Sequence, residues 1–163
     1  MNEVNNLTNE MIKYYCGQPN RIQHFLKVHA FAKLIGQMEN LDDNTEYILE
    51  VAAIVHDIGI KEAERKFSRC DGNLQEQEGP PIAKEMLTKL GFDKEVIKRV
   101  MYLIAHHHTY KNVDGQDYQI LIEADFLVNL YEDNSEKSAI ISAYNKIFKT
   151  NAGKKLCEQM FAL

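Results

Sequence analysis

Four places in this sequence carry imidazole or carboxylate groups inside otherwise apolar stretches. His24 lies in RIQHFLKVHAFA, and the pair His56–Asp57 lies near the end of the apolar run AAIVHDIGI. Asp125 lies in ILIEADFLVNL, and three histidines at positions 106–108 follow the apolar VMYLI. A buried carboxylate is costly unless a cation or hydrogen-bond donors compensate it. A divalent ion would compensate both aspartates, and this nitrogen and oxygen ligand set suits Mn, Fe, Co, Ni or Zn.

Each of these places taken alone has an ordinary structural explanation. A single His-Asp pair or a lone core histidine such as His24 is more often structural than metal-binding, and Asp125 could accept an arginine. Three consecutive histidines cannot all point one way on a helix, so we expect at least one of them to face solvent. The metal hypothesis therefore depends on all four places occurring together. His29 lacks such support and is interpreted as a helix-side residue.

The elements that must position these groups are predicted to be helices. Apolar residues recur every three or four positions, and turn residues are few. Adjacent residues on a helix diverge by about 100°, so His56 and Asp57 converge only if their helix ends there, as Gly59 suggests. We predict an all-α fold with an irregular, polar segment over 59–79 and helices over 8–16, 20–37, 44–58, 80–90, 93–107, 117–133, 135–149 and 152–162.

Composition narrows the class of protein. The chain has 163 residues, a formal net charge of −5 and a pI near 5.7, which argue for one domain and against general nucleic-acid coating. No apolar run approaches the length of a membrane span, and the N-terminus does not resemble a signal peptide. The three cysteines are isolated, which disfavours disulfides and thiolate sites. We expect a soluble cytoplasmic protein that does not associate with membranes.

From about residue 21 to 129 the sequence resembles the HD-domain superfamily of metal-dependent phosphohydrolases. The resemblance is carried by RIQHFLKVHAFA, AAIVHDIGIK, VMYLIAHHH and EADFLVN, in that order. It implies a single HD domain over 1–163, built as a phosphodiesterase-like helix bundle with its motif core at about 20–130. Helices over 135–162 would pack on that core or form a homodimer surface, and the sequence leaves the oligomeric state open. The implied activity is hydrolysis of a small phosphoester, such as a nucleotide or dinucleotide.

The resemblance also implies a ligand set for one or two divalent transition ions. The primary ligands would be His24, His56, Asp57 and Asp125. Some relatives carry a further histidine where this chain has Glu78, which either ligates through oxygen or favours the start of a helix opened by Pro80. For a second ion the apolar frame favours His107, then His108, over His106.

Within the implied mechanism, a metal-activated water attacks phosphorus, and Asp57 or a nearby histidine takes its proton. Lys61 either neutralises the phosphate or is an exposed loop lysine; Arg21, Lys27 and Lys111 are further cations that the sequence cannot orient. Two alternatives stay open. The superfamily also includes mixed-valence di-iron oxygenases, and a helical domain with a metal could serve as a non-catalytic nucleotide sensor.

Overall fold

The protein is described by a computed structural model covering residues 2–163. Within this range every regular element is a helix, which confirms the all-α prediction. The helices are α1 (Glu3–Tyr14), α2 (Pro19–Met38), α3 (Asp43–Val55), α4 (Ile60–Phe67), α5 (Gly72–Lys89), α6 (Lys94–Ile104), α7 (Gln116–Glu132), α8 (Lys137–Lys146) and α9 (Asn151–Phe161).

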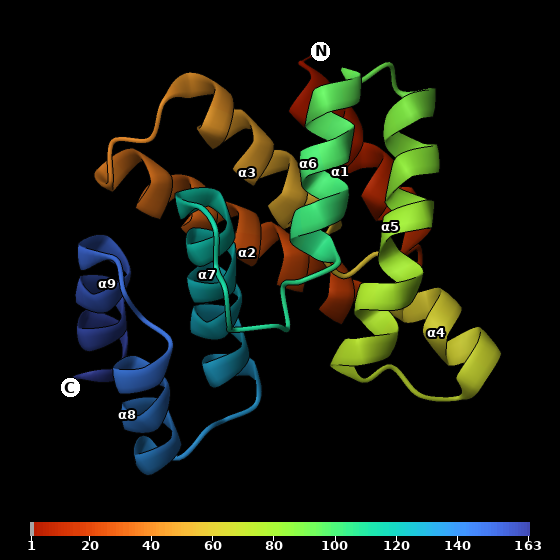
Figure 1. Ribbon diagram of the computed structural model, residues 1–163. Helices are drawn as coiled ribbons and strands as arrows, with labels where there is room; N and C mark the ends of the chain where they lie inside the picture. The colour runs from red at the N-terminus through yellow and green to blue at the C-terminus, as the bar shows by residue number, and fades with distance from the viewer. Residues whose placement is uncertain (1) are drawn as a thin grey trace.

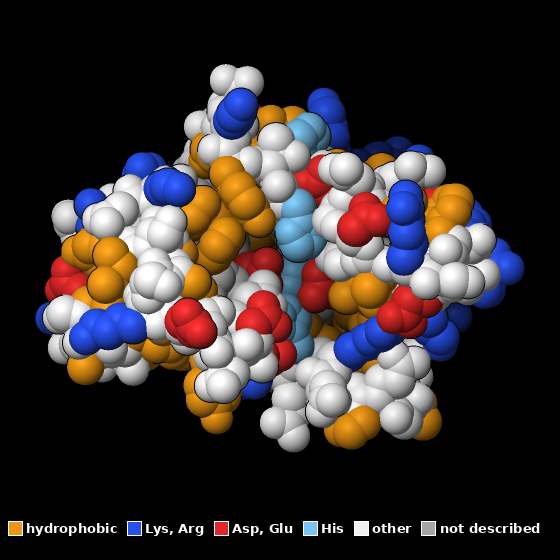
Figure 2. All heavy atoms as spheres, turned by 90° about the horizontal axis from the view of Figure 1, so that it is seen from below, with side chains coloured by type: hydrophobic (Ala, Val, Ile, Leu, Met, Phe, Trp, Pro, Cys, Tyr) orange, Lys and Arg blue, Asp and Glu red, His pale blue; other side chains and the backbone are white. Residues whose placement is uncertain are grey.

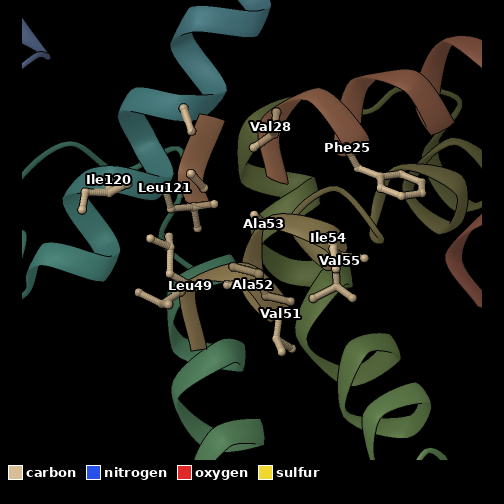
Figure 3. Packing of buried hydrophobic residues seen from close by; sticks show 14 of the residues in the cluster. Phe25, Val28, Leu49, Val51, Ala52, Ala53, Ile54, Val55, Ile120 and Leu121 are labelled. Atoms are coloured by element: carbon tan, nitrogen blue, oxygen red, sulfur yellow. The ribbon is translucent and has the colours of Figure 1, made fainter. Parts of the chain in front are cut away.

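Helices α2, α3 and α7 pack against one another and form the centre of the molecule. Figure 1 shows α4, α5 and α6 on one side of this centre and α8 and α9 on the other. The buried side chains come from all three central helices, including Val28 of α2, Leu49 and Ala53 of α3, and Leu121 of α7 (Figure 3). Each of these four side chains is fully buried, so the three helices have little freedom to move relative to one another.

The predicted irregular segment over 59–79 is wrong. It contains all of α4 and the first part of α5, which begins at Gly72 rather than at the proline pair. The Asp71 side chain accepts from the backbone N–H of Leu74 and caps α5, and the helix then continues through Pro80 and Pro81. The start of this helix was predicted at residue 80 because proline usually occupies the first turn of a helix. Here both prolines lie inside α5, which is held by tertiary packing.

The close approach between α5 and the turn before α4 depends on glycine. An ideal Cβ placed on Gly59 would lie 2.6 Å from the backbone nitrogen of Gly79 and 2.8 Å from the carbonyl oxygen of Gln75. No side chain fits at those distances, so Gly59 lets the backbone of α5 lie directly against the turn between α3 and α4. This contact places the first turns of α5 beside the polar residues that follow α3.

The remaining boundaries differ from the predicted ones mostly by one to three residues, although α1 starts five residues earlier than predicted because Asn2 caps it. Helix α9 packs against α7, α2 and α8, and α8 reaches the rest of the chain chiefly through α9. In the part of the chain that the structure describes, no helix has the length and apolar character needed to cross a membrane.

Candidate metal centre

The end of α3 delivers two side chains to one place. Helix α3 stops at Val55, three residues before its predicted end, and His56 forms its C-cap. The chain then turns tightly, with hydrogen bonds from Ile58 N to Val55 O (3.0 Å) and from Ile60 N to Asp57 O (3.1 Å). Because regular helix geometry ends here, His56 and Asp57 are free to converge.

Four side chains from three elements meet at this turn. The Nε2 atom of His24, on α2, lies 3.2 Å from each of three atoms: His56 Nε2, Asp57 Oδ2 and Asp125 Oδ1. The Nε2 atom of His56 lies 3.3 Å from the same Asp57 oxygen and 3.5 Å from the same Asp125 oxygen. Ligand atoms held tetrahedrally at about 2.1 Å from a metal are about 3.4 Å apart. These five distances are close to that spacing, and the ligand atoms of His24, His56 and Asp57 form a group that could hold one metal ion.

The other ring nitrogens of the histidines are held by acceptors. His56 Nδ1 lies 2.7 Å from the carbonyl oxygen of Ala53, and His24 Nδ1 lies 3.3 Å from both carboxylate oxygens of Glu132. Donation of Nδ1–H to these acceptors leaves the Nε2 lone pairs directed into the cluster, which is the usual arrangement of a metal-binding histidine. Asn129 similarly donates to Asp125 Oδ1, at 2.9 Å.

A second group of donors lies on the other side of Asp57. His107 Nε2 is 3.4 Å from Asp57 Oδ1, while its Nδ1 lies 2.7 Å from the carbonyl oxygen of Ile104. This Nε2 atom is buried, and within residues 2–163 no hydrogen bond satisfies it. His107, His108 and Asp57 have ligand atoms within 4.8 Å of one another. Asp57, His107 and His108 are therefore the residues that would hold a second ion.

The charges of the cluster depend strongly on one another. Burial would lower the pKa of His24, but its hydrogen bonds to Asp125 and Asp57 outweigh burial and raise the pKa to about 9. Burial also opposes the shift at Asp57, whose pKa the neighbouring imidazoles of His56 and His107 nevertheless hold well below its ordinary value. The two carboxylates thus hold positive charge in their surroundings, and a divalent ion would take the place of the imidazolium protons.

His108 lies at the edge of the same group. Burial and the nearby His107 lower its pKa to about 4, which keeps the imidazole neutral, as a metal ligand must be. Its Nε2 lies 2.8 Å from Gln75 Oε1, a contact that the approach of α5 makes possible. His106 turns away, with its ring 4.3 Å from that of Tyr102, which agrees with its low rank among the three.

Two further residues considered from the sequence do not join the converging donors. Helix α5 begins six residues before Glu78, so the alternative in which its carboxylate favours the start of a helix is wrong. The buried Glu78 carboxylate instead accepts from Lys66 Nζ at 2.8 Å. Lys61 does not line the cavity beside the cluster; its Nζ donates to the Tyr14 carbonyl oxygen at 3.0 Å and lies over the Tyr14 ring.

Four polar residues line this cavity without having been predicted as site residues: Asn20, Gln75, Asn129 and Glu132. Two of them had a usable signal, since Asn129 and Glu132 follow Asp125 by four and seven residues and so share its helix face. Gln75 had none, because the segment containing it was not expected to be helical. The cavity opens as a cleft with the histidines along its floor and acidic side chains beside them (Figure 2).

Comparison with known proteins agrees with this arrangement. A sequence model described as the HD domain matches residues 21–149. A crystal structure described as a predicted HD superfamily hydrolase, from an uncultured Thermotogales bacterium, is similar with a TM-score of 0.67 and 25% sequence identity. That similarity covers 98% of this chain and 84% of the other chain. No protein with a curated description matches the chain in sequence.

Proposed function

The chain belongs to the HD-domain family, and on that premise we propose that it is a metal-dependent phosphohydrolase that cleaves a small phosphoester, most suitably a nucleotide. The observation that carries this proposal is the convergence of His24, His56, Asp57 and Asp125 at 3.2–3.5 Å. Three of them, His24, Asp57 and Asp125, line an open cavity. A buried cluster of this kind has no structural need to open onto a cavity, whereas a catalytic centre must.

The proposed metal ligands are the protein's own histidine and aspartate side chains. His24, His56 and Asp125 would hold the first ion, and Asp57 offers one oxygen to that group and the other to His107. A bound divalent ion supplies Lewis acidity toward a phosphoryl oxygen and lowers the pKa of water. The nitrogen and oxygen donors suit Mn, Fe, Co, Ni or Zn.

Asp57 is the proposed proton acceptor. Its side chain is 17% exposed, more than that of any other member of the four-residue cluster, so a water molecule in the cavity can reach it. Tyr15 donates to the Asp57 carbonyl oxygen at 2.6 Å and holds the backbone at this residue. A fixed carboxylate beside the cavity is well placed to orient a water molecule and accept its proton.

An aromatic pair next to the cluster in sequence offers a surface for the base of a nucleotide substrate. The rings of Tyr110 and Phe126 meet edge to face, with centroids 5.3 Å apart. Tyr110 follows His108 by two residues and Phe126 follows Asp125 by one, and both His108 and Asp125 line the cavity. Neither ring lines the cavity itself. The Tyr110 side chain is 45% exposed, so it is the member of the pair that a nucleobase could pack against.

The test is phosphate release by purified protein from nucleoside phosphates, cyclic nucleotides and dinucleotides. We expect turnover that a chelator abolishes and Mn²⁺ or a similar ion restores, and that Asp57→Ala lacks. Glu123→Gln is a matched control, because Glu123 is a buried carboxylate of α7 outside the cluster.

Absence of turnover by fully metal-loaded wild type would contradict the proposal. Dioxygen consumption by the iron form would then indicate an oxygenase, and nucleotide binding without turnover would indicate a sensor. Equal turnover by wild type and Asp57→Ala would identify a contaminating activity.

A further inference from the structure

The cavity over the metal cluster is small and carries little positive charge of its own. Its volume is about 250 Å³, below the 300–1,000 Å³ that is usual for sites enclosing a whole organic ligand. It has room for the reacting phosphoryl group and the atoms bonded to it. The rest of a substrate must extend into the cleft that Figure 2 shows.

Among the described residues that line the cavity, Arg21 is the one lysine or arginine. Lys27, six residues further along α2, does not line the cavity, and its Nζ pairs with Glu132 at 2.8 Å. Lys61 is bound to the backbone of α1. Besides Asp57 and Asp125 of the cluster, Glu132 also lines the cavity with its carboxylate. A substrate with several phosphoryl groups would therefore meet a single guanidinium in the cavity, that of Arg21.

Arg21 is held in place from two sides and still has an unused donor. One of its terminal nitrogens, Nη2, donates to Glu64 of α4, and the guanidinium lies over the Tyr15 ring, 5.7 Å from its centroid. The other, Nη1, is buried and makes no hydrogen bond with any residue in 2–163. A guanidinium fixed at the cavity wall with one donor unsatisfied is suited to one oxyanion, because the fork geometry of arginine matches phosphate.

From these observations we propose that the site selects phosphomonoesters over nucleoside di- and triphosphates, and that Arg21 is the residue that recognises the single phosphoryl group. The inference rests on the proposed function and narrows its substrate class. A monoester places its phosphoryl group between the metal cluster and Arg21. Each further phosphoryl group adds negative charge that no additional lysine or arginine lining the cavity balances.

The experiment compares the mono-, di- and triphosphate of one nucleoside as substrates for the Mn²⁺-loaded protein. We expect kcat/KM for the monophosphate to exceed that for the triphosphate at least tenfold. We expect Arg21→Gln to raise KM for the monophosphate about tenfold or more while its bound metal stays at the wild-type level. Arg65→Gln is the matched control, because Arg65 also pairs with a glutamate, Glu62, but lies on the surface outside the cavity.

Calorimetric titration with inorganic phosphate gives a readout that does not depend on turnover. Wild type and Arg65→Gln should bind phosphate equally, and Arg21→Gln should bind it about tenfold more weakly. Turnover of the triphosphate equal to or faster than the monophosphate would overturn the inference and leave the phosphohydrolase proposal standing. No turnover of any phosphate would contradict that proposal, and phosphate binding unaffected by Arg21→Gln would overturn the role of Arg21 in either case.

Discussion

Helix α7 buries two carboxylates only two residues apart, and their surroundings are opposite in kind. Glu123 is fully buried and accepts from Lys149 N (2.6 Å), Thr150 N (2.9 Å), the Thr150 hydroxyl and Gln119 Nε2 (2.8 Å). Asp125 is 4% exposed, and its partners are one amide, from Asn129, and two histidine nitrogens. Glu123 is satisfied by donors of the loop before α9 and by Gln119 of its own helix, whereas Asp125 faces two imidazoles that we propose as metal ligands.

The difference shows that burial of an acidic residue does not by itself indicate a metal site. What distinguishes Asp125 is the identity of the atoms around it: imidazole nitrogens whose other nitrogen is already held by an acceptor. Glu123 instead joins α7 to the loop that precedes α9, a structural role that backbone N–H donors fulfil without any ion. Substitution at the two positions should therefore affect different properties of the protein.

Asp125→Asn is expected to have the largest effect. It removes a charged ligand, so bound metal should fall and kcat/KM should drop by more than about 100-fold, because even residues that only support ligands cost about 10–100-fold. Metal analysis and phosphate release measure the two effects. Retention of wild-type metal content in Asp125→Asn would remove this residue from the site.

Removal of the ion should lower the thermal stability of wild type substantially. At a free metal concentration about 100 times the Kd, binding contributes about 2.7 kcal/mol, or a Tm shift of about 5–10 °C for a domain of this size. Calorimetry before and after chelation measures the shift. Glu123→Gln should show the same shift from its own lower starting Tm, and a smaller shift in that variant would mean that the two regions are coupled.

Glu123→Gln itself should destabilise the fold by about 1–3 kcal/mol, since an amide cannot accept all the donors that the carboxylate satisfies. Denaturant unfolding measures this loss. Metal content and KM should match wild type, and a loss of metal in this variant would contradict the separation of the two sites.

Asn129→Ala tests the support of Asp125 rather than the ligand. Loss of the 2.9 Å hydrogen bond should weaken metal affinity by about tenfold without removing the ion at saturating concentration. Titration with Mn²⁺ measures the affinity. An affinity equal to wild type would show that Asp125 needs no help from this amide.

Glu78→Ala is expected to have the smallest effect on the site. Its carboxylate pairs with Lys66, whose side chain is 42% exposed, so stability should fall by about 1 kcal/mol or less from the lost pair. The number of bound ions should not change. A drop in that number would restore Glu78 as a ligand.

The sequence predicted the four residues of the cluster better than it predicted the polar residues around them. His24, His56, Asp57 and Asp125 stood out because each interrupts an apolar frame, and the order of those frames resembles a known family. Gln75 could not be found, because its position depends on α5 running through two prolines and packing on Gly59.

Glu123 and Asp125 illustrate the same limit within one helix. Both lie in the apolar run ILIEADFLVNL, so hydrophobic patterning could not tell the structural carboxylate from the proposed ligand. The partners that separate them come from the loop before α9 in one case and from α2 and the end of α3 in the other, which are distant in sequence. Lys61 shows the reverse case: its position beside the motif suggested a role, but its side chain reaches α1 instead.

The most direct test of the central claim is an anomalous difference map from crystals soaked with Mn²⁺. The account predicts a strong peak within about 2.0–2.3 Å of His24 Nε2, His56 Nε2 and one oxygen each of Asp57 and Asp125. It also predicts no peak beside Glu123. A map without density at the four-residue cluster, under conditions where the protein binds Mn²⁺ in solution, would contradict it.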